Sequence, residues 1–187
     1  GGGGILYSKK LFGESMKLAT LVSGPGAGSK LLHTLLDNTS DLYIIPGYCL
    51  MYFYPHYFEI IKKKPTYKSL IFELLERLPT LYDTRIMPGS ESLDSLGSNG
   101  EQFFAVTISQ FAEKIFELRS NEEFNYTSRE LLIDIHRAHY QLFGNKETYP
   151  CEPDVYMADI HVDLYLEQFK KDFPEAPVIA TMRRPSV

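Results

Sequence analysis

The chain has 187 residues, of which 44% are hydrophobic, and its formal net charge at pH 7 is −5. This length suits one α/β domain with a sizeable core, and the hydrophobic content argues against a disordered protein. The negative charge argues against a general nucleic-acid-binding surface, and no apolar run is long enough to span a membrane.

The beginning of the chain has the composition of a tag or leader. Residues 1–4 are consecutive glycines, which are typical of a linker, and Met16 directly precedes the first apolar run. We therefore expect residues 1–15 to lie outside the fold and residues 16–187 to form a single α/β domain.

The first predicted elements are a buried strand, a glycine-rich loop and a helix. The apolar run 18–22 leads into three glycines within five residues, and leucines follow at helical spacing. Such an arrangement forms an anion site, because loop N–H groups and the helix dipole face the same point. The alternative is an ordinary strand–turn–helix in which the glycines only tighten the turn. We expect the helix to pack a stripe of leucines on the sheet: Leu31, Leu32, Leu35 and Leu36.

This loop departs from the two common phosphate-binding fingerprints. A Walker A loop ends in Gly-Lys-Ser/Thr, whereas Lys30 follows Ser29 and precedes Leu31, so the magnesium-binding hydroxyl is missing. The dinucleotide fingerprint also fails, because the third glycine, Gly28, comes one residue early.

The next segment predicts a second strand and an aromatic cluster. A strand is expected at 42–45, and the helix between the first two strands makes a right-handed parallel βαβ unit. The aromatic residues of 48–58 indicate either core packing or the lining of a pocket. Residues 79–100 are rich in Gly, Ser, Pro and Asp, which predicts a mobile loop.

Two long helices are expected after this loop, at 101–119 and 128–143. Thr127 and Glu130 have capping-box spacing at the start of the second helix, and Gly144 suits its C-cap. We expect a lobe of three helices, at about 52–145, over the carboxyl edge of the strands.

The last part of the chain predicts two more strands. They are expected at 155–160 and 178–182, with a short helix at 164–173 between them. Strands that are uniformly apolar and separated by helices indicate a parallel sheet covered by helices on both faces. The expected fold is therefore a three-layer, P-loop-like α/β fold with a helical insertion between the second and third strands.

Two segments together resemble the sulfotransferases that use 3′-phosphoadenosine-5′-phosphosulfate (PAPS). Residues 23–42 resemble the 5′-phosphosulfate loop, helix and second strand of that family, and 173–185 resemble its strand carrying the 3′-phosphate arginine. The resemblance implies a nucleotide-binding transferase that moves a sulfuryl group from PAPS to a small-molecule or glycan acceptor. It implies these PAPS-binding residues: Gly24, Pro25, Gly26, Ala27, Gly28, Ser29, Lys30, Leu31 and Arg183.

The chain departs from the family pattern at several points. Gly26 stands where most members have a basic residue, and we expect Lys30 to supply that charge from the other side of the loop. Arg184 stands where the family usually has a small polar or acidic residue. The chain also stops before the serine and the nucleotide-covering segment of the family, so the resemblance implies an N-terminal portion.

His161 is the predicted general base, because it follows the third strand and histidine has a pKa suited to proton transfer. A histidine that only caps the following helix is the alternative, and Asp159 is the next candidate base. Lys30 is expected to stabilise charge on the leaving phosphate. No metal is predicted, and His33, His136 and His139 are interpreted as structural.

Competing functions remain open at this point. A P-loop kinase or NTPase is indicated by Lys30 and by 155–159, which imitates a Walker B strand, and a degenerate nucleotide-binding domain is indicated by Gly26. Cys49 and Cys151 lack metal-ligand spacing and are expected to be separate thiols, which favours a reducing, cytoplasmic compartment. The sequence does not indicate the acceptor or the oligomeric state.

Overall fold

The computed structural model describes residues 17–23, 27–36, 39–46, 49–86, 103–119, 127–160 and 164–182. It is an α/β fold with a four-stranded, all-parallel sheet in these residues. The elements in chain order are β1 (Lys17–Ser23), α1 (Ser29–Leu36), β2 (Leu42–Ile44), α2 (Cys49–Ile61), α3 (Tyr67–Arg77), the 3₁₀ helix η1 (Pro79–Leu81), α4 (Ile108–Glu117), α5 (Ser128–Phe143), β3 (Val155–Ile160), α6 (Leu166–Asp172) and β4 (Val178–Thr181).

The strand order is β2-β3-β1-β4, so β1 lies between the two strands that come last in the chain. Along β1, Val22 is in register with Ile160 of β3 and with Ala180 of β4. Thr20 links the two central strands, β1 and β3. Its buried hydroxyl donates a hydrogen bond of 2.8 Å to the carbonyl oxygen of Ala158.

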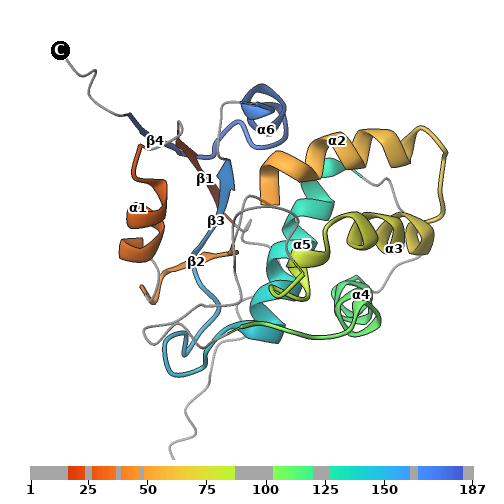
Figure 1. Cartoon of the computed structure of the whole chain (residues 1–187), viewed down its shortest axis with the longest axis horizontal. Coiled ribbons are helices and arrows are strands. Elements are labelled where there is room, and N and C mark those ends of the chain that lie inside the picture. Colours follow the sequence, from red (N-terminus) through yellow and green to blue (C-terminus); the bar gives the residue numbers. More distant parts are fainter. Residues whose placement is uncertain are drawn as a thin grey trace, which may run out of the picture.

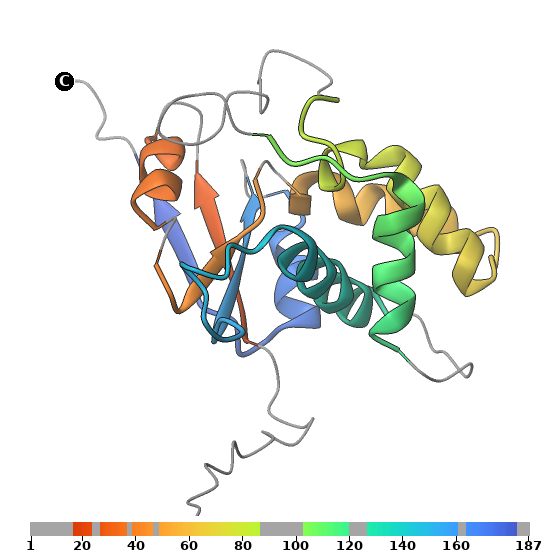
Figure 2. The same ribbon diagram turned by 90° about the horizontal axis from the view of Figure 1, so that it is seen from below.

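Helices cover both faces of the sheet, which confirms the predicted three-layer arrangement. Helix α1 lies on one face, and α2, α5 and α6 lie on the other (Figure 1). The view from below shows the same two sides and places α3 and α4 farther from the sheet (Figure 2). Strand residues 19, 21, 44 and 157 pack towards α1, whereas residues 18, 156 and 158 pack towards the larger helical side.

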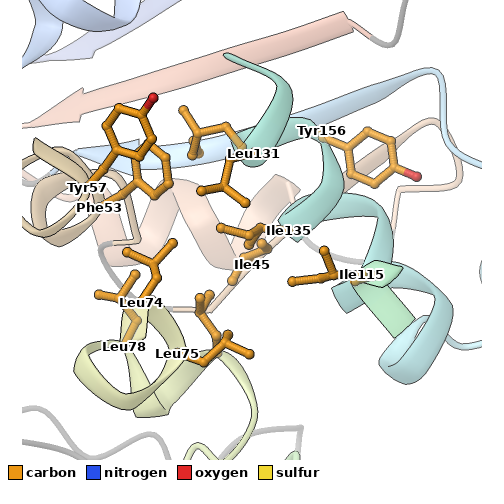
Figure 3. Close-up of a cluster of buried hydrophobic side chains, with 14 of the residues drawn as sticks. Ile45, Phe53, Tyr57, Leu74, Leu75, Leu78, Ile115, Leu131, Ile135 and Tyr156 are labelled. Carbon is orange, nitrogen blue, oxygen red and sulfur yellow. The ribbon is translucent and has the colours of Figure 1, made fainter. Parts of the chain in front are cut away.

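The main core lies between the sheet and the helical lobe. Side chains from β3, α2, α3, α4 and α5 converge there, as Figure 3 shows. Its labelled members are Ile45, Phe53, Tyr57, Leu74, Leu75, Leu78, Ile115, Leu131, Ile135 and Tyr156. Because each is at most 5% exposed, the lobe and the sheet share one hydrophobic core.

Threonine caps position the helices of the lobe. The Thr127 hydroxyl accepts from the backbone N–H of Glu130, and the Glu130 carboxylate accepts from the N–H of Thr127, so the predicted capping box is confirmed. Thr107 and Gln110 form the same reciprocal pair at the start of α4. The predicted helix at 101–119 therefore begins later than expected, at Ile108.

Three other sequence expectations are corrected. In the predicted mobile segment, residues 79–86 contain η1 and the buried Leu81, and Asp83 forms an antiparallel bridge with Ala105. Residues 87–100 lie outside the described residues. The lobe has four helices, α2–α5, in the described residues, and it packs on a sheet face rather than over the carboxyl edge.

The leucine stripe of α1 is divided between sheet and surface. Leu32 and Leu36 pack on the sheet, as expected, whereas Leu31 is 65% exposed and Leu35 is 67% exposed. Residues one position apart are rotated by about 100° around a helix, so one pair can face the sheet while the other faces away.

Candidate functional site

The candidate site lies at the carboxyl edge of the sheet. Strands β1, β3 and β4 are parallel neighbours and end at Ser23, Ile160 and Thr181, and Ser23 is in register with Thr181. The carboxyl ends of these three strands therefore lie at the same edge of the sheet. These are the strand ends to which the glycine segment, His161 and Arg183 are attached in sequence.

The connections that follow β1 and β3 diverge at this edge. The chain leaves β1 towards α1 on one face and leaves β3 towards α6 on the opposite face (Figure 1). Connections that diverge from adjacent parallel strands leave a gap outside their carboxyl ends, where ligands bind in open α/β sheets. The ends of β1 and β3 are the corresponding point in this sheet.

The start of α1 has the backbone geometry expected of a glycine loop. Gly28 has φ +85°, a left-handed conformation that favours glycine, and its carbonyl oxygen accepts the first helical hydrogen bond from Leu32 N–H at 3.0 Å. The amides of the first turn of any helix have no acceptor within the helix, and such amides bind anions at helix N-termini. Ala27 is half-buried, Gly28 and Leu31 are exposed, and the backbone of Lys30 lies in this first turn.

Several predicted site residues lie outside the described residues. They are Gly24, Pro25, Gly26, His161 and Arg183. Asp159 is described at the backbone, where it is in register with Leu21 of β1, one position before the end of β3. The structure therefore brings together the elements that carry the predicted site, and the catalytic roles of the residues stay predictions.

The aromatic cluster of α2 belongs largely to the core. Phe53 and Tyr54 are fully buried, and Tyr57 is nearly so, which supports core packing over the lining of a pocket. Tyr54 donates a hydrogen bond of 2.9 Å to the Asp172 carboxylate, and burial raises the pKa of the Tyr54 phenol well above its usual value. Tyr52 is exposed, and Tyr48 lies outside the described residues.

Two other histidines are buried in α5. His136 and His139 are fully buried, and burial lowers their pKa values to about 4 and about 3. The Nδ1 atom of His139 lies 2.7 Å from the Tyr43 hydroxyl, and Nδ1 of His136 lies 2.7 Å from the Leu132 carbonyl oxygen. This burial fits the structural role predicted for both, and His33 is partly buried on α1.

The sequence did not single out Tyr165, which begins α6 with φ 65°. Only the backbone conformation distinguishes this residue, since a tyrosine in the left-handed region is uncommon. Among the described residues, no group of three or more His, Cys, Asp or Glu side chains could hold a metal. No described helix has the length and apolarity needed to cross a membrane.

No family model, curated protein or solved structure matches this chain significantly.

Proposed function

We propose that this chain binds PAPS at the carboxyl edge of its sheet and transfers the sulfuryl group to a hydroxyl or amine acceptor. The observation that carries the proposal is the parallel register of β1, β3 and β4. The strand ends next to the glycine segment, His161 and Arg183 lie on three neighbouring strands. These are the positions that a ligand with two separate anionic ends requires.

The two ends of PAPS would be held by different kinds of group. The phosphosulfate end would bind the amides at the start of α1, with Lys30 adding a positive charge. Arg183 would bind the 3′-phosphate, because a planar guanidinium can donate two parallel hydrogen bonds to phosphate oxygens. The left-handed Gly28 supports this assignment, since it allows the backbone to turn tightly before the helix.

In the proposed transfer step, the acceptor attacks the sulfur atom of PAPS and His161 takes up the acceptor proton. The acceptor oxygen or nitrogen forms a bond to sulfur, while the bond between sulfur and the oxygen of the 5′-phosphate breaks. The acceptor proton passes to His161, and adenosine 3′,5′-bisphosphate leaves with the bonding electron pair. Lys30 and the loop amides stabilise the charge that develops on the departing phosphate. A sulfuryl group carries less charge than a phosphoryl group, so we propose that no metal is needed for this step.

Calorimetry tests the binding half of the proposal. We expect the protein to bind adenosine 3′,5′-bisphosphate without magnesium, and Lys30→Ala to weaken binding by about 1.5–3 kcal/mol, the contribution of a charge-assisted hydrogen bond. Lys68→Ala is a matched control, since Lys68 is also the second residue of a helix, α3, and is exposed. Equal affinity in both variants would contradict the role of Lys30.

The same titrations separate the alternative functions. A P-loop kinase or NTPase would bind ATP with magnesium in preference to adenosine 3′,5′-bisphosphate. A degenerate nucleotide-binding domain would bind the bisphosphate without transferring sulfuryl groups from PAPS to any acceptor. Turnover of radiolabelled PAPS therefore distinguishes an enzyme from a binding module.

A further inference from the structure

The two edge strands of the sheet differ in how they are covered. Within the described residues, β2 forms one edge and β4 forms the other (Figure 1). On β2, Tyr43 and Ile44 are buried, and the Tyr149 hydroxyl donates a hydrogen bond of 3.1 Å to the carbonyl oxygen of Leu42. On β4, by contrast, residues 178–180 are all exposed. The described part of the chain therefore covers the β2 edge and leaves the β4 edge open.

The backbone groups that face the open edge follow from the pairing of β4 with β1. Thr20 is in register with Val178, and its N–H donates a hydrogen bond of 3.1 Å to the carbonyl oxygen of Pro177. In a parallel ladder, such a residue bonds to the two residues that flank its partner, so the odd-numbered residues of β4 bond to β1. The N–H and C=O groups of Val178 and Ala180 therefore point towards the open edge.

The β4 strand lacks the features that keep edge strands of natural proteins unpaired. Such strands carry charged residues, prolines or bulges. The β4 sequence is Val-Ile-Ala-Thr, which has no charge and no proline, and its register with β1 is continuous from Val178 to Thr181. An uncharged, regular edge of this kind is suited to pairing with another strand.

The open groups of β4 are complementary to those of a second copy. A two-fold axis through Ile179 makes two β4 strands antiparallel and places Val178 of each copy opposite Ala180 of the other. Because both residues point their N–H and C=O groups outward, the strands exchange four hydrogen bonds. The two Ile179 side chains then lie directly opposite each other in the closely spaced type of antiparallel pair, where β-branched side chains stabilise the pairing.

The face of the sheet that carries Ile179 has further exposed apolar side chains. Ile179 is in register with Leu21, which packs towards α1, so its side chain lies on the α1 face. Ile179 is 38% exposed, and Leu31 and Leu35 of α1 are exposed as well. A stable interface needs apolar area beyond the hydrogen bonds of one strand pair, and these side chains are a source of it.

We propose that two copies of this chain dimerise by pairing their β4 strands antiparallel, which joins the two sheets into one continuous sheet. The inference is independent of the proposed function. Since the strands of the two copies run in opposite directions, the carboxyl edges of the two sheets lie at opposite ends of the dimer. The two candidate sites are therefore kept apart by this pairing.

Sedimentation velocity of the full chain tests this interface. We expect wild type at micromolar concentrations to sediment with twice the monomer mass of 21.4 kDa. Ile179→Lys places two like charges opposite each other, so we expect it to raise the dimer dissociation constant by at least about tenfold. Ile86→Lys is the matched control, because it makes the same change at an isoleucine that is 47% exposed in the helical lobe. This control should dimerise like wild type.

Mixing two charged variants tests the register. Ile179→Lys and Ile179→Glu should each be monomeric alone and should dimerise when mixed in equal amounts, because opposite charges then face each other. This recovery also shows that both variants are folded. A monomeric wild type would overturn the proposal and would assign the open edge to a different partner. A dimer that survives Ile179→Lys would place the interface on another surface, and a mixture that stays monomeric would rule out the pairing of Ile179 with its own copy.

Discussion

The buried histidines of α5 should make the stability of this protein depend strongly on pH. His136 and His139 are fully buried, and within the described residues the Nε2 atoms of both lack a hydrogen-bond partner. Burial lowers their pKa values from 6.5 to about 4 and about 3, because a charged imidazole would lose its hydration without gaining an anion. Both side chains are therefore neutral in the fold at neutral pH.

The size of the effect follows from the difference in proton binding between the folded and unfolded chain. Below pH 6.5 the unfolded chain binds a proton at each histidine, whereas the folded chain binds none until the pH approaches 4. These histidines therefore leave the free energy of unfolding at its full value above pH 6.5, and they reduce it as the pH falls below 6.5. One pKa unit corresponds to about 1.4 kcal/mol, so lowering the pH from 7.5 to 5 should remove about 2 kcal/mol per histidine. The pair together should remove about 4 kcal/mol.

Urea unfolding, followed by far-ultraviolet circular dichroism at several pH values, measures this loss. A comparison of wild type with His136→Gln and His139→Gln isolates the pair, because each variant removes one titrating group and should halve the loss. His56, whose pKa is also lowered by burial, is present in every protein compared. Buried neutral histidines are ruled out as the cause if the free energy of unfolding is the same at pH 5 and pH 7.5, or if both variants lose as much stability as wild type.

Three further predictions concern the sheet and its carboxyl edge. Gly28→Ala should cost about 1–2 kcal/mol of unfolding free energy, because alanine is strained at φ +85° although its Cβ would meet no atom within 4 Å; an unchanged urea midpoint would contradict this. Thr20→Val should cost about 1 kcal/mol through loss of its buried hydrogen bond, and equal stability in urea would show that the bond contributes nothing. His161→Ala should lower sulfuryl turnover by about 10²–10⁴-fold without changing nucleotide affinity, and full turnover would make Asp159 the next base to test.

The strands and the capped helix were predictable because local sequence determines them. Uniformly apolar runs flanked by glycine or proline indicated all four strands, and β3 has the expected bounds, Val155–Ile160. The capping box at Thr127 placed the start of α5 correctly. Thr107 and Gln110 carry the same spacing at the start of α4, so that signal was present in the sequence and was missed.

Other features depend on contacts between distant residues. Residues 79–86 are connected to a distant part of the chain by the antiparallel bridge between Asp83 and Ala105. The amino-acid composition of the segment gives no sign of this pairing. The exposure of Leu31 and Leu35 depends on where α1 sits on the sheet, since both pairs of leucines fit a helical period equally well. For the candidate site, the sequence indicated which segments matter, and the parallel register brings their strand ends to one edge.

The affinity ratio between adenosine 3′,5′-bisphosphate and adenosine 5′-monophosphate measures whether this edge recognises the 3′-phosphate of PAPS. These ligands differ only in the 3′-phosphate, which we assign to Arg183. We predict that wild type prefers the bisphosphate by at least about tenfold, the value of one charge-assisted hydrogen bond, and that Arg183→Ala binds both ligands equally. A wild-type protein without this preference, or an Arg183→Ala variant that keeps it, would contradict the assignment of this edge as a PAPS site.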